Sequence, residues 1–171
     1  MVLQELIILL LNGAQGSASG TQYAVGTSVV LSDNTTFYAI WLAHNNLINT
    51  LNASDWSVTT NNNGGTYSFT KGTSLAMSAT RKSWSDIGVK STAIDITHYT
   101  RLQVVLSNPS KGTGTNCNLV TSSGSINILG AGTFDISNYT GTAYISAYVC
   151  AGYSGSNFKT ASLTITKLLF S

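Results

Sequence analysis

Three tryptophans and a set of asparagines are the side chains in this sequence that are best suited to binding a ligand. A sugar ring stacks on a flat aromatic face, and its hydroxyl groups then need amide or hydroxyl partners beside that face. Trp84 is the strongest single candidate, because it lies in the polar stretch RKSWSDIG at residues 81–88. The alternative for such a tryptophan is a place in the core or in an interface. The glycan ligands that we expect are Trp84, Trp56, Tyr153 and Asn116.

Residue types that catalyse reactions are few and scattered. There are two histidines, His44 and His98, and six acidic residues. His98 occupies a position at which an internal copy of the same segment has Asn138, which indicates a turn residue rather than a general base. The sequence has no nucleophile elbow, phosphate-binding loop or Cys-x-x-Cys motif. No two acids lie near each other in the sequence, although two of the six could still meet in space as a glycosidase pair. We therefore expect no enzymatic activity, no metal and no cofactor.

The internal copy is a seven-residue segment, IDITHYT at residues 94–100 and FDISNYT at residues 134–140. In each copy the Asp side chain can accept hydrogen bonds from backbone groups two residues on, and the following Thr or Ser can act similarly. The Tyr just before the next strand can cover the end of a core. The pattern predicts a repeated corner of a β-sandwich. The alternative is that Asp95 and Asp135 are metal ligands or catalytic acids.

Short β-type runs separated by Gly, Asn, Ser and Thr fill most of the chain. In TAYISAYVC at residues 142–150, aliphatic residues alternate with Tyr and Ser, as expected for a sheet covered on one side. The sequence predicts an all-β protein: a jelly-roll β-sandwich at 54–171, a small N-terminal β module at 1–41 and a linker at 42–53. Residues 41–51 form either a turn or two of helix or part of that linker. The strands expected in the sandwich are 55–60, 66–70, 74–80, 90–95, 101–107, 116–121, 125–130, 142–150 and 160–170.

The composition indicates a protein that works outside cells or inside a large assembly. Charged residues make up 8% of the chain, against about 25% in a typical soluble domain. The alternative is an ordinary neutral surface on a Thr- and Asn-rich β protein. Lys and Arg are scattered, so no basic stripe suggests nucleic-acid binding. Cys117 and Cys150 are too few for a disulfide scaffold, and they either form one bond or, as we favour, remain half-buried thiols.

The apolar run LIILLL at residues 6–11 is the most hydrophobic part of the sequence. It is too short for a signal peptide or a membrane span, and it lacks a preceding basic region. Because the run does not alternate with polar residues, both of its sides should be covered. We expect it to dock on another copy or on another virion protein through Leu6, Ile7, Ile8, Leu9, Leu10 and Leu11.

Residues 16–41 resemble the C-terminal half of the Listeria–Bacteroides repeat, the internalin-type B repeat. The matching pattern is Gly20-Thr21-x-Tyr23-x-x-Gly26, an alternating strand at 28–31, and NTTFYAIW at 34–41. The first half of the repeat is missing or replaced by residues 1–11. Such repeats form small β-grasp-like modules in bacterial surface proteins and in phage structural proteins, so the resemblance implies a docking or spacing element.

Residues 54–171 look like the jelly-roll modules of phage fibre or decoration proteins and of carbohydrate-binding proteins. The features that carry this likeness are the start at Asp55-Trp56, the corner at 94–104 and the closing strand LTITKLL at 163–169. We expect a non-enzymatic bacteriophage virion protein, that is, a head fibre, a decoration protein or a tail-tip component. The reasons are the missing signal peptide, the low charge and the half-repeat at residues 16–41.

The partners expected for such a protein are other virion proteins, further copies of the chain with a trimer favoured, and a host-surface or mucosal glycan. No nucleic acid and no membrane insertion are expected. The alternatives are a carbohydrate-binding module of a bacterial cell-surface or secreted protein, and a structural cement without a ligand.

Overall fold

The computed structural model describes residues 13–15, 22–23, 37–39, 44–62, 65–80, 85–110, 114–151 and 160–171. The chain divides into two compact units, Met1–Ala43 and His44–Ser171. In the first unit, β1 (Gly13–Gln15) pairs antiparallel with both β2 (Gln22–Tyr23) and β3 (Phe37–Ala39). The apolar run at 6–11 and the alternating strand expected at 28–31 lie outside the described residues.

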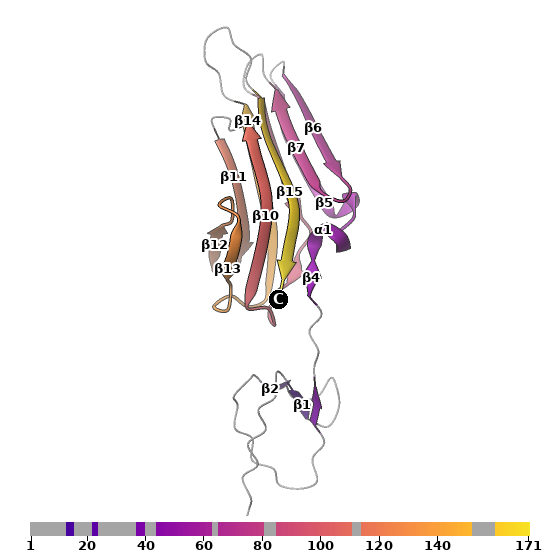
Figure 1. Ribbon diagram of the computed structural model, residues 1–171, viewed down its shortest axis with the longest axis vertical. Coiled ribbons are helices and arrows are strands. Elements are labelled where there is room, and N and C mark those ends of the chain that lie inside the picture. The colour runs from indigo at the N-terminus through magenta and orange to yellow at the C-terminus, as the bar shows by residue number, and fades with distance from the viewer. Residues whose placement is uncertain are drawn as a thin grey trace, which may run out of the picture. The chain divides into compact units, whose positions relative to one another are not determined.

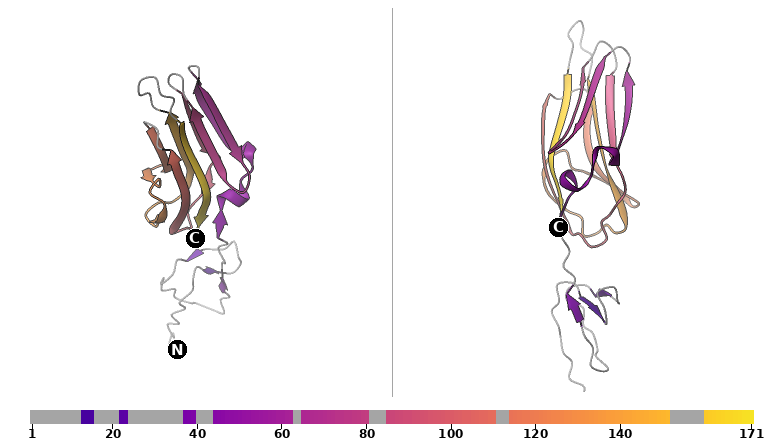
Figure 2. Two further views of the ribbon diagram at one scale, coloured as in Figure 1. Left: turned by 45° about the horizontal axis from the view of Figure 1, so that its top comes forward. Right: turned by 90° about the vertical axis from the view of Figure 1, so that its right-hand side faces the viewer.

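The second unit consists of two antiparallel sheets that pack face to face (Figures 1 and 2). The β15 sheet has the order β13 (Gly132–Asp135), β10 (Arg101–Ser110), β15 (Thr160–Phe170), β7 (Leu75–Thr80) and β6 (Thr66–Lys71). The β14 sheet has the order β12 (Gly124–Asn127), β11 (Gly114–Thr121), β14 (Thr142–Ala151), β8 (Ser85–Ser91) and β5 (Trp56–Asn62). Two short strands pair antiparallel with the ends of longer ones: β4 (Asn45–Asn46) pairs with β15, and β9 (Ile94–Asp95) pairs with β14.

The connections between these strands are those of a jelly roll. From β7 onward the chain changes sheet at each connection except at the β8–β9 step and the β11–β12 hairpin, which stay within the β14 sheet. This gives two interleaved four-stranded layers, β13-β10-β15-β7 and β12-β11-β14-β8, with β6 and β5 added at the edges. The predicted all-β sandwich is confirmed.

The core lies between the sheets and is made mainly of alternate residues of the inner strands, such as β7, β14 and β15. In β14 the predicted aliphatic face is confirmed, because alternate residues from Ala143 to Val149 are at most 2% exposed. Small and branched side chains dominate, so the two layers can interdigitate without large voids. The core residues of β7, β14 and β15 are Leu75, Met77, Ala79, Ala143, Ile145, Ala147, Val149, Ala151, Ala161, Leu163, Ile165, Leu168 and Phe170.

The repeated corner is present twice with the same hydrogen bonds, as predicted. Asp95 Oδ1 accepts from the backbone N–H of Thr97 at 2.9 Å and from its hydroxyl at 2.6 Å. Asp135 Oδ1 accepts from the N–H and the hydroxyl of Ser137 at the same two distances. The carboxylates therefore serve turn formation, and the structural interpretation of the segment is confirmed.

A third corner, which the sequence did not reveal, occurs at residues 127–132. Asn127 Oδ1 accepts from Leu129 N–H at 2.9 Å, and the isoleucine that follows the Asx residue is fully buried in all three corners: Ile96, Ile128 and Ile136. All three corners carry the chain from one sheet to the other, at β9–β10, β12–β13 and β13–β14. Each thus places one isoleucine in the core where the chain crosses between the layers.

The predicted linker at 42–53 is wrong over most of its length. Residues 45–46 pair with β15, and the helix α1 (Leu47–Thr50) follows, with the 3₁₀ turn η1 at Ala53–Asp55. Leu47 and Ile48 are fully buried in the sandwich core. The Asn46 side chain accepts hydrogen bonds from the N–H groups of Ile48 and Leu168, at 3.3 and 3.1 Å. The sandwich unit therefore begins at His44 rather than at residue 54.

Candidate functional site

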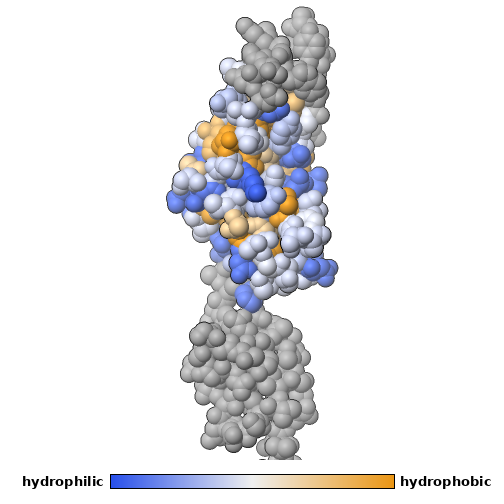
Figure 3. Space-filling model, turned by 180° about the vertical axis from the view of Figure 1, so that it is seen from behind, coloured by the Kyte–Doolittle hydropathy of each residue, from blue (hydrophilic) through white to orange (hydrophobic). Residues whose placement is uncertain are grey.

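The outer face of the β14 sheet carries the aromatic and amide groups that could bind a ligand. Side chains that alternate with the core residues point outward from this sheet. The strand pairing aligns Asn116, Tyr148, Gly88 and Thr59 in one row across β11, β14, β8 and β5. Figure 3 shows the molecule from the side opposite to Figure 1, where polar and apolar residues are interspersed.

The ring of Tyr148 fills a gap that two glycines leave in the neighbouring strands. Its Cδ2 lies 3.7 Å from the position that a Cβ would take at Gly88, and its Cε1 lies 3.5 Å from the corresponding position at Gly114. Cδ2 and Cε1 are on opposite sides of the ring, so the ring spans the space between β8 and β11. Because glycine has no side chain, nothing from these two positions rises above the ring. We call Tyr148, its two flanking glycines, Asn116 and Asp86 the tyrosine platform.

The polar end of Tyr148 is held by residues of the same face. Its hydroxyl donates to Asp86 Oδ2 at 3.1 Å. Burial, followed by a hydrogen bond with Cys150, raises the pKa of the Tyr148 hydroxyl above its ordinary value. The phenol therefore stays protonated at neutral pH and acts as the donor to the carboxylate. Cys150 belongs to the outward-facing set of β14 but is only 4% exposed, consistent with a ring that covers it.

A second tyrosine on this face is covered by a cation. The Lys90 Nζ atom lies 3.9 Å from the centroid of the Tyr144 ring, which is a cation–π contact. A ligand would have to displace the ammonium group before it could stack on that side of Tyr144. Tyr148 has no such cation contact among the described residues, so we take it as the better stacking surface of the two.

The predicted site residues have different positions in the structure. Asn116 is exposed and lies directly opposite Tyr148 in the register of β11 and β14. Trp56 is wrong as a glycan ligand, because it is 4% exposed and belongs to the core cluster. Trp84 and Tyr153 lie outside the described residues. The platform residues that the sequence did not single out are Tyr148, Asp86, Gly88 and Gly114.

Among the described residues, no three His, Cys, Asp or Glu side chains come together in a way that could hold a metal ion. His44 and His98 are both exposed, and His98 lies in the turn of the first corner, as predicted. The described segments also include no helix long and apolar enough to cross a membrane.

The two cysteines are separate buried thiols. Cys117 faces the core opposite Ala147, whereas Cys150 faces outward on the neighbouring strand opposite Gly114. Burial raises the pKa of the Cys117 thiol to about 12, so it is an unreactive thiol at neutral pH. The disulfide alternative is therefore wrong.

Comparison of the chain with protein-family models, curated proteins and solved structures gives no match, and its function is therefore argued from the geometry of its surfaces.

Proposed function

We propose that this chain is a non-enzymatic structural protein of a bacteriophage virion, and that its jelly roll binds a glycan at the tyrosine platform. The observation that carries the glycan part is the Tyr148 ring, which lies between two glycines with an exposed amide on one side and a carboxylate at its hydroxyl end. Jelly rolls recur in viral capsid proteins and in lectins. The low charge of the chain, 8% of residues, suits a protein whose surfaces meet those of neighbours.

The platform has the groups that a neutral sugar requires. The C–H face of a pyranose ring can pack on the exposed face of Tyr148. The Asn116 amide can both donate to and accept from ring hydroxyls, and Asp86 has acceptor capacity left beyond its bond with Tyr148. One ring and two polar groups make a weak site, so useful binding requires several copies displayed together. A virion oligomer, for which we favour a trimer, supplies such a display.

A glycan array probed with the labelled full-length chain tests the platform. We expect binding that Tyr148→Ala abolishes and that Asn116→Ala weakens. Tyr148→Phe keeps the stacking surface and loses only the hydroxyl group, with its hydrogen bonds to Asp86 and Cys150. Tyr67→Ala is the matched control, because Tyr67 is a tyrosine that is 47% exposed on the edge strand β6, away from the platform. Equal binding by Asn116→Ala, Tyr148→Ala and the unmodified chain would contradict the glycan assignment.

The virion assignment is tested separately, by immunogold labelling of purified particles with an antibody against the chain. Label on the particles is expected. Label on bacterial surfaces or in culture supernatant alone would instead favour the alternative, a carbohydrate-binding module of a cell-surface or secreted protein. If the particles are unlabelled but the chain still binds glycans, the virion assignment is refuted, whereas glycan binding at the tyrosine platform is not.

Residues 6–11 are proposed to dock the chain on its neighbours. The full chain should then sediment as an oligomer, and replacing Ile7 and Leu9 by Ser should give monomers. A monodisperse monomer of the unmodified chain at micromolar concentration would contradict this docking role.

A further inference from the structure

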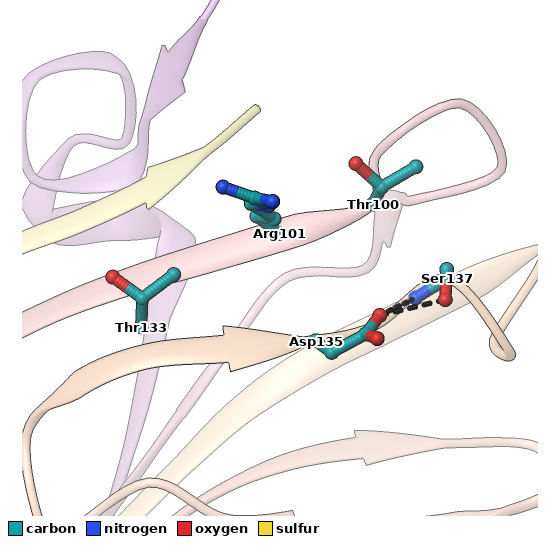
Figure 4. A pocket seen from close by; sticks show the side chains of 5 residues that line it. All are labelled: Thr100, Arg101, Thr133, Asp135 and Ser137. Carbon is teal, nitrogen blue, oxygen red and sulfur yellow. Dashed lines mark hydrogen bonds between the residues drawn. The ribbon is translucent and has the colours of Figure 1, made fainter.

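A polar depression lies on the other sheet, at the start of β10 and the end of β13. Its volume is about 430 Å³, and it is lined by Thr100, Arg101, Thr133, Asp135 and Ser137. Figure 4 shows these five side chains, with the Arg101 guanidinium above β10 and apart from the Asp135 carboxylate. Arg101 and Asp135 are register partners on the two neighbouring strands, so the depression combines a cation, a carboxylate and three hydroxyl groups.

The polar groups of this depression are only partly used by the fold. Asp135 Oδ1 accepts both hydrogen bonds from Ser137, which leaves Oδ2 available as an acceptor. The Arg101 side chain is exposed and has no ion pair or hydrogen bond with the described residues. Its five N–H donors are therefore available to a ligand.

The corner at Asp95 shows that the arginine is not needed for the turn. The hydrogen bonds from Thr97 to Asp95 have the same lengths, 2.9 and 2.6 Å, as those from Ser137 to Asp135. The register partner of Asp95 is Thr142, an uncharged residue. The same corner thus forms without a guanidinium beside it, and the turn geometry does not account for the arginine at position 101.

We propose that this depression binds a sugar that carries a carboxylate, of the uronic or sialic acid class. The planar guanidinium of Arg101 matches a carboxylate in a bidentate arrangement. The free Oδ2 of Asp135 accepts from a ring hydroxyl, and the hydroxyls of Thr100 and Thr133 complete the set of partners. The inference goes beyond the proposed function, because the depression belongs to the β15 sheet and shares no residue with the tyrosine platform.

The ligand must keep its carboxylate away from Asp135, since two negative charges at contact repel each other. A sulfate ion could accept hydrogen bonds from the Arg101 guanidinium and the threonine hydroxyls, but it has no hydrogen to donate to the Asp135 acceptor. A carboxylated sugar uses both kinds of group, because its charge and its hydroxyls are separated by the ring. The depression should therefore bind an acidic sugar more tightly than it binds sulfate or a neutral sugar.

The test uses the full-length chain labelled with ¹⁵N and titrated with methyl β-glucuronide, methyl α-N-acetylneuraminide, methyl glucoside and sodium sulfate. At least one of the two acidic sugars should shift the amide signals of residues 100–101 and 133–135, and methyl glucoside should shift them far less. Arg101→Gln should weaken the binding of the acidic sugar by about tenfold or more, since a charged hydrogen-bonded pair is lost. Lys167→Gln is the matched control, because it removes the same unit of charge on the neighbouring strand β15, outside the depression.

Tyr148→Ala separates this inference from the proposed function, since it should leave binding of the acidic sugar at residues 100–101 intact. Equal affinity for sulfate and the acidic sugars would overturn the proposal in favour of a non-selective anion site. Failure of both acidic sugars to bind, or equal affinity of Arg101→Gln and the unmodified chain, would also overturn it.

Discussion

Replacing Ile136 by alanine should remove one of the three residues that anchor the sheet crossings. The side chain is fully buried beneath the corner at residues 135–140. At about 0.8 kcal/mol per buried methylene, the lost transfer free energy alone is about 2 kcal/mol. The cavity that remains raises the total to roughly 2–5 kcal/mol. That is a large part of the roughly 5–15 kcal/mol by which a domain of this size is stable.

Urea unfolding of the full chain, followed by tryptophan fluorescence, measures this cost. With a slope of about 1–3 kcal/mol per molar urea, the midpoint should fall by about 1–2 M. Ile128→Ala should cause a similar loss, because Ile128 has the same position in the third corner. Val105→Ala is the control: Val105 is 45% exposed on β10, and its replacement should cost less than about 1 kcal/mol.

The comparison between Ile136 and Ile128 decides whether the corners are equivalent. A loss of more than about 2 kcal/mol for Ile136→Ala together with less than about 1 kcal/mol for Ile128→Ala would refute the third corner as a core anchor. Small losses in both variants would refute the view that isoleucine burial at the crossings stabilises the sandwich.

The corner aspartates, the turn glycines and the buried thiols can be tested in the same way. Asp95 and Asp135 each accept hydrogen bonds from the side chain and the backbone of the turn residue two positions on, and these bonds lower the pKa of both carboxyl groups. The ionised carboxylates therefore stabilise the folded chain above the unfolded-state pKa of about 4. This stabilisation is lost as the pH falls through the lower folded-state pKa. Replacing both aspartates by asparagine should keep the turns, as asparagine does in the third corner. The urea midpoint of this variant should fall less between about pH 5 and about pH 2 than that of the unmodified chain. An equal fall in both proteins would contradict this. Gly141→Ala should destabilise by about 1–2 kcal/mol because Gly141 has φ +82°, whereas Gly72→Ala, with no neighbour within 4 Å of the added carbon, should be nearly neutral in the same assay. Tyr148→Ala should make Cys150 react with Ellman's reagent in the native protein while Cys117 stays protected, and two protected thiols would show that the ring does not cover Cys150.

The parts of the fold that follow from local pattern could be predicted from the sequence. The aliphatic face of β14 is visible in its alternation, and the first two corners share Asp, Ile, a hydroxyl residue and Tyr at fixed spacing. The third corner does not match this pattern, because it has Asn127 in place of Asp, Leu129 in place of the hydroxyl residue and Ala131 in place of Tyr. The structure shows that the corner needs only an Asx acceptor followed by a buried isoleucine.

The elements that the sequence did not reveal depend on tertiary pairing. β13 has four residues, follows a turn in which Ala131 and Gly132 have positive φ, and is held by its register with β10. The strand expected at 90–95 includes only the last two residues of β8, because the outward face of β8 has an acid, a glycine and a lysine. For residues 41–51 the Asn-rich composition, of low helix propensity, leaves a short helix and a linker as alternatives, and burial of Leu47 and Ile48 in the core accompanies the helix that forms, α1.

The candidate site was the least predictable feature. Asp86 and Tyr148 are 62 residues apart in sequence, and only the pairing of β8 with β14 brings them together. The role of Gly88 and Gly114 depends on both strands flanking the same tyrosine, which sequence spacing alone does not specify. Asn116 was identified because its residue type suits sugar binding, and the register then places it beside the ring.

The position of β15 has a consequence for how this protein is made. β15 lies between β10 and β7 and pairs with both, from Leu102↔Phe170 on one side to Thr160↔Thr80 on the other. During translation, β7 and β10 are synthesised long before their shared neighbour leaves the ribosome. Until then, half of the sandwich has unpaired backbone edges and an open hydrophobic layer, so the chain cannot fold progressively from its N-terminus and must close in one late step.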